Sequence, residues 1–167
     1  MEKWVVTAKK ADFQKIGQTF GIDPVIARLI RNRDVEGMEN IRSYLYGTLE
    51  ELPSPWFLKD MKKAVEILKD KIDQKARIRI IGDYDIDGVN ATYILQEGLA
   101  GLGADVDTDI PDRIRDGYGL NRNLIDRALE DGIDTIITCD NGIAAGEEIL
   151  YGKERGLTVI VLSLIHI

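Results

Sequence analysis

Three carboxylates at alternating positions stand out in the middle of the chain. Asp83, Asp85 and Asp87 follow a short isoleucine-rich run at 78–81, and a segment with helical spacing of apolar residues comes after them. Carboxylate oxygens are the ligands that Mg²⁺ and Mn²⁺ prefer. The N-terminal amides of a following helix favour a phosphate at the same place. The pattern therefore indicates a site for a divalent cation and a phosphate-containing substrate.

Three interpretations of this acidic motif are open. An EF-hand calcium loop also begins D-x-D-x-D-G, but it needs Glu where this chain has Ile94, and a helix rather than a strand before it. A haloacid-dehalogenase-type phosphatase would use Asp85 as covalent nucleophile and Asp87 as acid or base. A two-metal phosphoesterase would gather carboxylates from several strand ends around two ions.

A fourth carboxylate, Asp140, follows another β-branched run at 135–138. In an open α/β sheet, ligands bind outside the carboxyl ends of the strands. If the two strands are neighbours, Asp140 can converge with Asp85 and Asp87, which favours the two-metal interpretation. The alternative is an ordinary turn, because Asp-Asn-Gly is a turn signal by itself.

The segment after the run at 106–110 offers contacts to a substrate. Arg113 can supply a forked contact to phosphate, and Gly117 and Gly119 let the backbone approach a ligand closely. Each has a simpler explanation, since an arginine here can form a surface ion pair and glycines are common turn residues.

Alternating strand and helix patterns predict the fold that must position these residues. Strands are expected at 78–81, 106–110, 135–138 and 158–161, with helices at 89–102, 122–131 and 144–155 between them. This alternation predicts an α/β fold with a mainly parallel sheet and flanking helices. The patterns divide the chain into a helical N-terminal region at 1–55, the α/β domain at 56–161 and an atypical apolar tail at 162–167.

Composition excludes several classes of protein. The chain has 167 residues with a net charge of −7, and its 44% hydrophobic content is that of a folded domain rather than a disordered segment. It has no bilayer-spanning stretch and no signal-peptide pattern, so we expect a cytoplasmic protein with no membrane partner. The single cysteine, Cys139, excludes a disulfide framework, and as a strand residue behind Asp140 it is not expected to be a nucleophile.

The net negative charge is concentrated in residues 81–140, which hold 14 acidic and only 4 basic side chains. An acidic region of this kind repels a phosphate backbone unless divalent cations invert the local field. The charge distribution therefore requires a metal if the partner is a nucleic acid.

Together these motifs resemble RecJ-type single-strand-specific exonucleases of the DHH phosphoesterase superfamily. The matching segments are Gly82-Asp-Tyr-Asp-Ile-Asp-Gly88, Pro111-x-Arg113, Asp116-Gly-Tyr-Gly-Leu120 and Asp140-Asn-Gly-Ile143. The resemblance implies a DHH-type domain that degrades single-stranded DNA in the 5′-to-3′ direction with two Mn²⁺ or Mg²⁺ ions, in DNA repair and recombination. It also implies a monomer, with a single-strand-binding protein or a helicase as a further partner.

The resemblance implies roles for individual residues as well. Asp85, Asp87 and Asp140 would be metal ligands, and Asp83 would be a ligand or a carboxylate behind the ligands. The substrate-binding residues that it implies are Arg113, Gly117, Tyr118, Gly119 and Asn141.

The chain departs from the family after the fourth predicted strand. An Asp-His-His should follow there, but the sequence continues Leu162-Ser-Leu-Ile-His166-Ile167. Without these imidazoles the two-ion site would be incomplete. We therefore expect a truncated, inactive N-terminal fragment whose last six residues are foreign. A non-catalytic module that binds Mg²⁺ or a nucleotide is the alternative.

Overall fold

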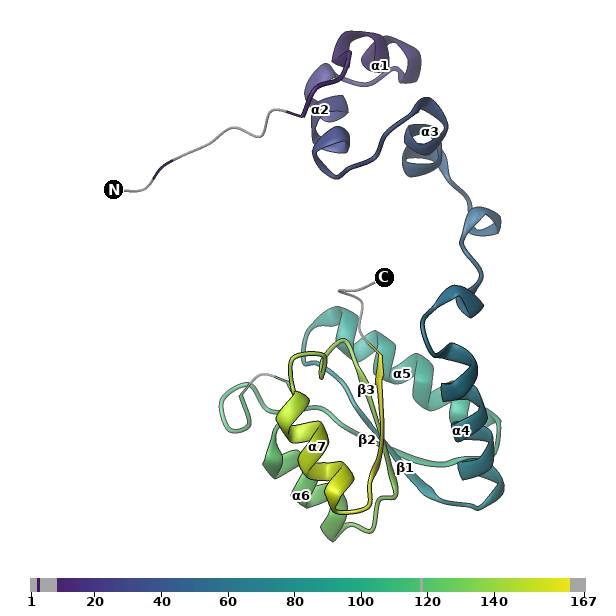
Figure 1. Cartoon of the computed structure of the whole chain (residues 1–167), viewed down its shortest axis with the longest axis vertical. Helices are drawn as coiled ribbons and strands as arrows, with labels where there is room; N and C mark the ends of the chain where they lie inside the picture. The colour runs from purple at the N-terminus through teal and green to yellow at the C-terminus, as the bar shows by residue number, and fades with distance from the viewer. Residues whose placement is uncertain (1–2, 4–8, 118, 163–167) are drawn as a thin grey trace. The chain divides into compact units, whose positions relative to one another are not determined.

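The computed structural model describes residue 3 and residues 9–117 and 119–162, and the chain divides into two compact units, Met1–Ser54 and Pro55–Ile167 (Figure 1). Each unit has an apolar core of its own. Residues 163–167 of the predicted tail, with His166, lie outside the described residues, and Leu162 ends the last strand.

The first unit is helical. Its helices are α1 (Phe13–Phe20), α2 (Pro24–Asn32) and α3 (Met38–Tyr46), and a short 3₁₀ turn follows at Leu49–Glu51. Asp23 caps α2, because its Oδ1 accepts a hydrogen bond of 2.7 Å from the amide of Val25, and Pro24 occupies the first helical position. The core residues of this unit are Ile16, Ala27, Ile30 and Ile41.

The second unit is built on a four-stranded parallel sheet. Its strands are β1 (Arg77–Ile81), β2 (Asp105–Asp109), β3 (Thr135–Cys139) and β4 (Thr158–Leu162), in the order β2-β1-β3-β4. This confirms the predicted α/β fold with a parallel sheet.

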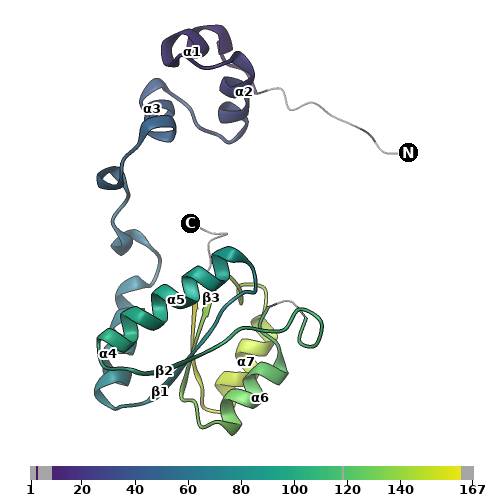
Figure 2. The same cartoon turned by 180° about the vertical axis from the view of Figure 1, so that it is seen from behind.

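Helices cover both faces of this sheet. A 3₁₀ turn at Pro55–Phe57 leads to α4 (Met61–Asp73), which lies with α5 (Ile86–Gly101) on one face. The other face is covered by α6 (Arg122–Glu130) and α7 (Gly146–Glu154), as Figures 1 and 2 show from opposite sides. Both faces of the central strands are therefore covered, which agrees with the abundance of isoleucine and threonine in β1 and β3.

Strand β1 lies in the middle of the sheet, and its side chains alternate between the two cores. Ile78 and Ile80 pack on the α4–α5 side, while Ile81 packs on the α6–α7 side. Beside β1, the register pairs Ile81 with Thr138 of β3. The residues that follow both strands therefore leave the sheet at the same edge.

A buried arginine joins β1 to the edge strand β2. Arg79 is 8% exposed, and its guanidinium donates two hydrogen bonds to Asp107, at 2.8 and 2.7 Å, and one of 2.8 Å to Asp131. The hydrogen bonds to Asp107 are the main reason that the pKa of Arg79 lies above its ordinary value. The buried charge is thus paired on both sides, as burial of a charge requires.

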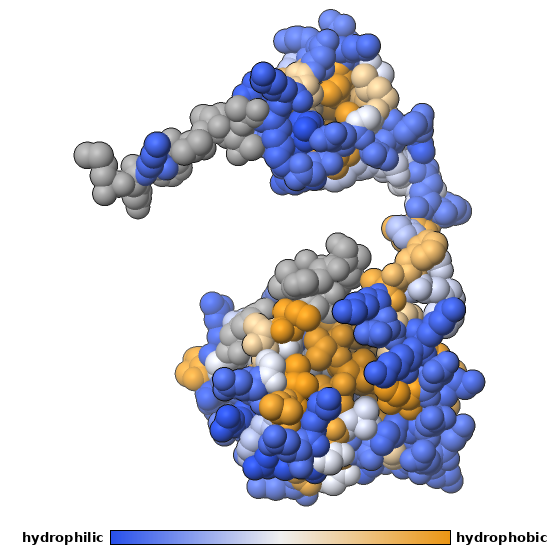
Figure 3. Space-filling model, in the orientation of Figure 1, coloured by the Kyte–Doolittle hydropathy of each residue, from blue (hydrophilic) through white to orange (hydrophobic). Residues whose placement is uncertain are grey.

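Apolar side chains also reach the surface of the second unit. Figure 3 shows them gathered over the middle of this unit, where Figure 1 draws β4 at the edge of the sheet. Within the part of the chain that the structure describes, no helix is long and apolar enough to cross a bilayer.

Candidate metal centre

Asp83 and Asp85 lie in the turn that connects β1 to α5. Asp83 is buried, at 2% exposure, and its Oδ1 accepts a hydrogen bond of 2.7 Å from the amide of Tyr84. Asp85 is the N-cap of α5, and its Oδ1 accepts a hydrogen bond of 2.9 Å from the amide of Gly88. Because of this cap, the helix begins at Ile86, three residues earlier than the apolar spacing predicts.

Gly88 allows the first turn of α5 to pack directly against Asp83. A Cβ at position 88 would lie 2.6 Å from both the Cβ and the carbonyl oxygen of Asp83, which no side chain could tolerate without displacing the turn. The motif therefore needs glycine here for close backbone approach.

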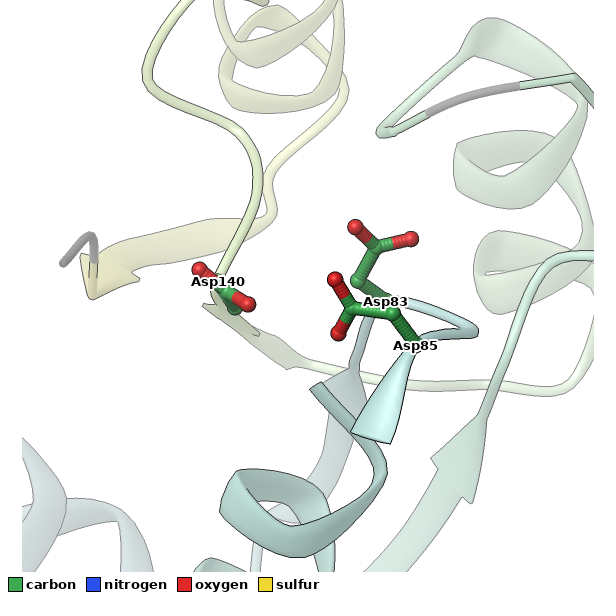
Figure 4. A group of neighbouring side chains, drawn as sticks. All are labelled: Asp83, Asp85 and Asp140. Atoms are coloured by element: carbon green, nitrogen blue, oxygen red, sulfur yellow. The ribbon is translucent and has the colours of Figure 1, made fainter. Parts of the chain in front are cut away.

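Asp140 approaches the same place from the end of β3. Its φ of 59° is in the left-handed region, which Asp tolerates better than most residues. Its amide donates a hydrogen bond of 3.1 Å to the carbonyl of Leu162 in β4. Figure 4 shows Asp140 at this strand end beside Asp83 and Asp85, which come from the turn after β1.

These three side chains form a compact group of negative charges. One carboxylate oxygen from each of Asp83, Asp85 and Asp140 lies within 4.8 Å of the other two. Among the residues that the structure describes, none of the ion pairs involves these three carboxylates. Burial, and then the charges of Asp85, Asp83 and Asp87, raise the pKa of Asp140. The donor set therefore fits a hard divalent cation, which would neutralise charge that the protein leaves uncompensated.

Asp87 has a different place from the other three predicted ligands. It lies exposed in the first turn of α5, and in the described part of the chain its carboxylate is not among the oxygens that gather within 4.8 Å. Its charge nevertheless raises the pKa of Asp140, so it belongs to the same electrostatic environment.

The connection after β2 brings Arg113 to this edge of the sheet. The guanidinium carbon of Arg113 lies 5.4 Å from the ring centroid of Tyr84, which separates Asp83 from Asp85 in the sequence. The exposed Arg113 side chain is therefore held beside the carboxylate-bearing turn by a cation–π contact.

The same connection is fixed at its base by ionic hydrogen bonds. Asp116 accepts hydrogen bonds of 3.0 Å from the amide of Asp112 and 3.1 Å from Arg127, and these two interactions lower its pKa. Gly117 and Gly119 have φ values of 78° and 75°, so both occupy a conformation that glycine adopts without cost. The predicted substrate residue Tyr118 lies outside the described residues.

Asn141 connects the ends of the two central strands. It is 4% exposed, and its Nδ2 donates a hydrogen bond of 3.2 Å to the carbonyl of Ile81. Its Oδ1 is buried without a hydrogen-bond partner among the described residues. The structure thus shows a cross-strand contact for this residue, whose predicted role was substrate binding.

Two polar residues that the sequence analysis did not single out also lie here. Tyr84 contacts Arg113, and Thr92 of α5 places a buried hydroxyl 2.8 Å from the carbonyl oxygen of Gly88 and 3.3 Å from Sγ of Cys139. One feature of the sequence could have pointed to Thr92: it is a threonine one turn after Gly88, on a helix face that otherwise carries apolar residues. Burial raises the pKa of the Cys139 thiol, which leaves it protonated and unsuited to nucleophilic attack.

Comparison with known proteins gives a consistent result. The chain matches the sequence model of the DHH family, N-terminal domain, over residues 77–163, which is more than half of its length. The single-stranded-DNA-specific exonuclease RecJ of Bacillus subtilis is 37% identical over 160 residues, which are 95% of this chain and 20% of that protein. This chain spans 20–25% of the length of the first curated relatives that it matches.

Two solved structures resemble the chain at both the sequence and the fold level. A crystal structure of exonuclease RecJ bound to manganese is 41% identical, with a TM-score of 0.60, over 67% of this chain and 28% of that chain. A structure of RecJ from Thermus thermophilus in complex with Mn²⁺ is 30% identical, with a TM-score of 0.59, over 90% of this chain and 20% of that chain.

Proposed function

The chain belongs to the DHH family, and from this premise we propose that it carries the first part of a divalent-cation site for hydrolysis of single-stranded DNA from the 5′ end. The observation that carries the proposal is the group formed by Asp83, Asp85 and Asp140, whose oxygens gather within 4.8 Å. The relatives support it, because they are named single-stranded-DNA-specific exonucleases and two of their structures contain manganese.

The three carboxylates would hold Mn²⁺ or Mg²⁺, and Asp87 would add charge from the first turn of α5. Two ions would occupy the complete site. A cation bound here supplies Lewis-acid stabilisation of the phosphate and lowers the pKa of a water molecule. In this proposal the role of the protein is to hold the carboxylates of Asp83, Asp85 and Asp140 close together.

The substrate phosphate would meet Arg113 beside this site. Its guanidinium is exposed and held against Tyr84, so it can donate to phosphate oxygens without leaving the carboxylate-bearing turn. The backbone at Gly117 and Gly119 would approach the nucleotide, and Asn141 would border it. Cys139 does not act as a nucleophile in this proposal, because it is buried in the core.

We further propose that these carboxylates bind the cation but do not suffice for fast hydrolysis. The Asp-His-His that names the family does not occur in this sequence. Loss of residues that merely orient metal ligands already costs about 10–100-fold in affinity or activity, and loss of ligands themselves costs more. Because the motifs resemble those of RecJ-type exonucleases, we propose that the complete activity serves DNA repair and recombination. We propose that it does so in the cytoplasm.

An exonuclease assay tests this function. Single-stranded DNA labelled at its 5′ or its 3′ end is incubated with Mn²⁺ and either this chain or a version joined after residue 161 to the remainder of a RecJ relative. We expect nucleotide release from the 5′ end by the extended protein only, and its loss on Asp85→Asn or with a chelator. Glu97→Gln, an exposed acidic residue of α5, is the matched control.

If the extended protein releases no nucleotide although the intact relative does so under the same conditions, the proposed function is wrong. Activity that survives Asp85→Asn would equally contradict the role given to the carboxylate group.

A further inference from the structure

The cation site is assembled from two segments that repel each other. Asp83 and Asp85 follow β1, whereas Asp140 follows β3, and the paired residues of these strands end at Ile81 and Thr138. Beyond that point the carboxylates lie close together with like charge. The protein must therefore hold the two segments at a fixed distance by other contacts.

One buried hydroxyl contacts both segments and the helix between them. Oγ1 of Thr92 donates a hydrogen bond of 2.8 Å to the carbonyl of Gly88, in the first turn of α5. The same atom lies 3.3 Å from Sγ of Cys139, the residue directly before Asp140. A hydroxyl has one proton, and it is used on Gly88, so the neutral thiol of Cys139 is the donor to Thr92.

The end of β1 packs against this hydroxyl as well. A Cβ on Gly82 would lie 1.9 Å from Oγ1 of Thr92, so the backbone directly before Asp83 touches the hydroxyl with no room for a side chain. Thr92 is 3% exposed, and solvent does not compete for these contacts. A single atom thus touches the residue before Asp83, the residue that closes the cap of Asp85, and the residue before Asp140.

We propose that Thr92 is a positioning residue of the cation site, whose hydroxyl fixes the distance between the turn that carries Asp83 and Asp85 and the strand end that carries Asp140. This inference rests on the proposed function, since it presupposes that the carboxylates bind a cation. Thr92 itself contacts neither cation nor substrate.

The test measures Mn²⁺ affinity of the chain from the electron paramagnetic resonance signal of free Mn²⁺, without any assay of activity. Thr92→Val keeps the shape of the side chain and removes the hydroxyl, and we expect it to raise the Kd for Mn²⁺ by about 10-fold. Thr92→Ser keeps the hydroxyl and should stay within about threefold of the unchanged chain.

Thr19→Val is the matched control. Oγ1 of Thr19 donates a hydrogen bond of 2.8 Å to the carbonyl of Lys15, which is the same contact to the residue four positions earlier, but in α1 and exposed. It should leave the Kd unchanged. If Thr92→Val binds Mn²⁺ as well as the unchanged chain, or if Thr92→Ser weakens binding as much as Thr92→Val, the inference is wrong.

Cys139→Ala and Cys139→Ser provide a second pair if Thr92→Val does not fold, as judged by circular dichroism. Alanine removes the donor to Thr92 and should weaken Mn²⁺ binding, and serine restores a donor and should recover it. Equal affinity of both variants with the unchanged chain overturns the inference. Absence of Mn²⁺ binding by the unchanged chain would instead overturn the proposed function, and this inference with it.

Discussion

At the scale of single residues, the ionised carboxylate of Asp140 lowers the stability of the folded, cation-free protein. Its pKa is raised from 3.8 by burial and by neighbouring carboxylates, so the native chain holds this proton more tightly than the unfolded chain does. The stabilisation that this proton gives the folded chain is fully present at pH values below the ordinary carboxyl pKa. It is lost as the pH rises through the raised pKa of Asp140. At pH 7 an ionised Asp140 therefore destabilises the cation-free protein.

Asp140→Asn should consequently stabilise the cation-free chain at pH 7. Asparagine removes the charge and tolerates the left-handed backbone, and because water screens this partly exposed carboxylate we expect a gain of less than about 1 kcal/mol in the free energy of unfolding, or at most about 2–4 °C in Tm. Thermal unfolding in the presence of a chelator measures it, and the difference should shrink as the pH is lowered toward the ordinary carboxyl value. A lower Tm for Asp140→Asn at pH 7 would show that the carboxylate contributes to stability instead.

The sequence predicts most of this site because its residues lie at strand ends. Asp85 and Asp140 could be expected to converge once their strands were taken as parallel neighbours, and the structure brings them together with Asp83. Whether Asp83 or Asp87 joins Asp85 and Asp140 depends on where α5 begins. Asp85 sets that start, because its side chain caps the helix. From the sequence, Thr92 stands out only as a threonine among apolar helix positions, because its contact with Cys139 of β3 joins residues 47 positions apart.

At the scale of secondary-structure elements, the sheet is held in register by charge as well as by apolar packing. Arg79 of β1 lies opposite Asp107 of β2 in the parallel register, with Asp131 after α6 as its other partner. This pairing explains Asp107, and Asp109 on the same strand lies 3.2 Å from Arg127. These aspartates would otherwise be unusual for a strand next to a buried one.

Asp107→Asn tests this interaction. The variant loses the two-pronged ionic contact to a buried guanidinium, so we expect the free energy of unfolding to fall by about 1–3 kcal/mol. Asp105→Asn is the matched control on the same strand, because its contact with Arg77 spans 3.8 Å between exposed side chains and should matter by less than about 0.5 kcal/mol. Denaturant unfolding measures both, and equal effects would contradict the special role of Arg79.

Helix α5 shows the limits of predicting elements from apolar spacing. Leu95 and Leu99 pack in the core, but Ile94 and Leu102, which fall on the same helical spacing of apolar residues in the sequence, are 69% and 71% exposed. The helix is apolar on more than one side, so spacing alone could not identify the face that meets the sheet. The packing of α5 against the sheet determines which face of the helix is buried.

At the scale of the whole molecule, the acidic charge is concentrated in the unit that contains the site. Residues 81–140 hold 14 acidic and 4 basic side chains, and they include all the carboxylates of the proposed centre. Such a region can approach a phosphate backbone only if cations offset its charge. Cation binding is therefore the central claim, on which the substrate proposal depends.

Calorimetric titration of the chain with Mn²⁺ tests that claim most directly, with Asp85→Asn and Glu97→Gln beside it. Asparagine is as good an N-cap as aspartate, so Asp85→Asn keeps the start of α5 while it removes one ligand charge. We expect saturable binding by the unchanged chain and by Glu97→Gln, and binding at least about 10-fold weaker by Asp85→Asn. Equal affinities of all three proteins would contradict the assignment of the carboxylate group as a metal centre.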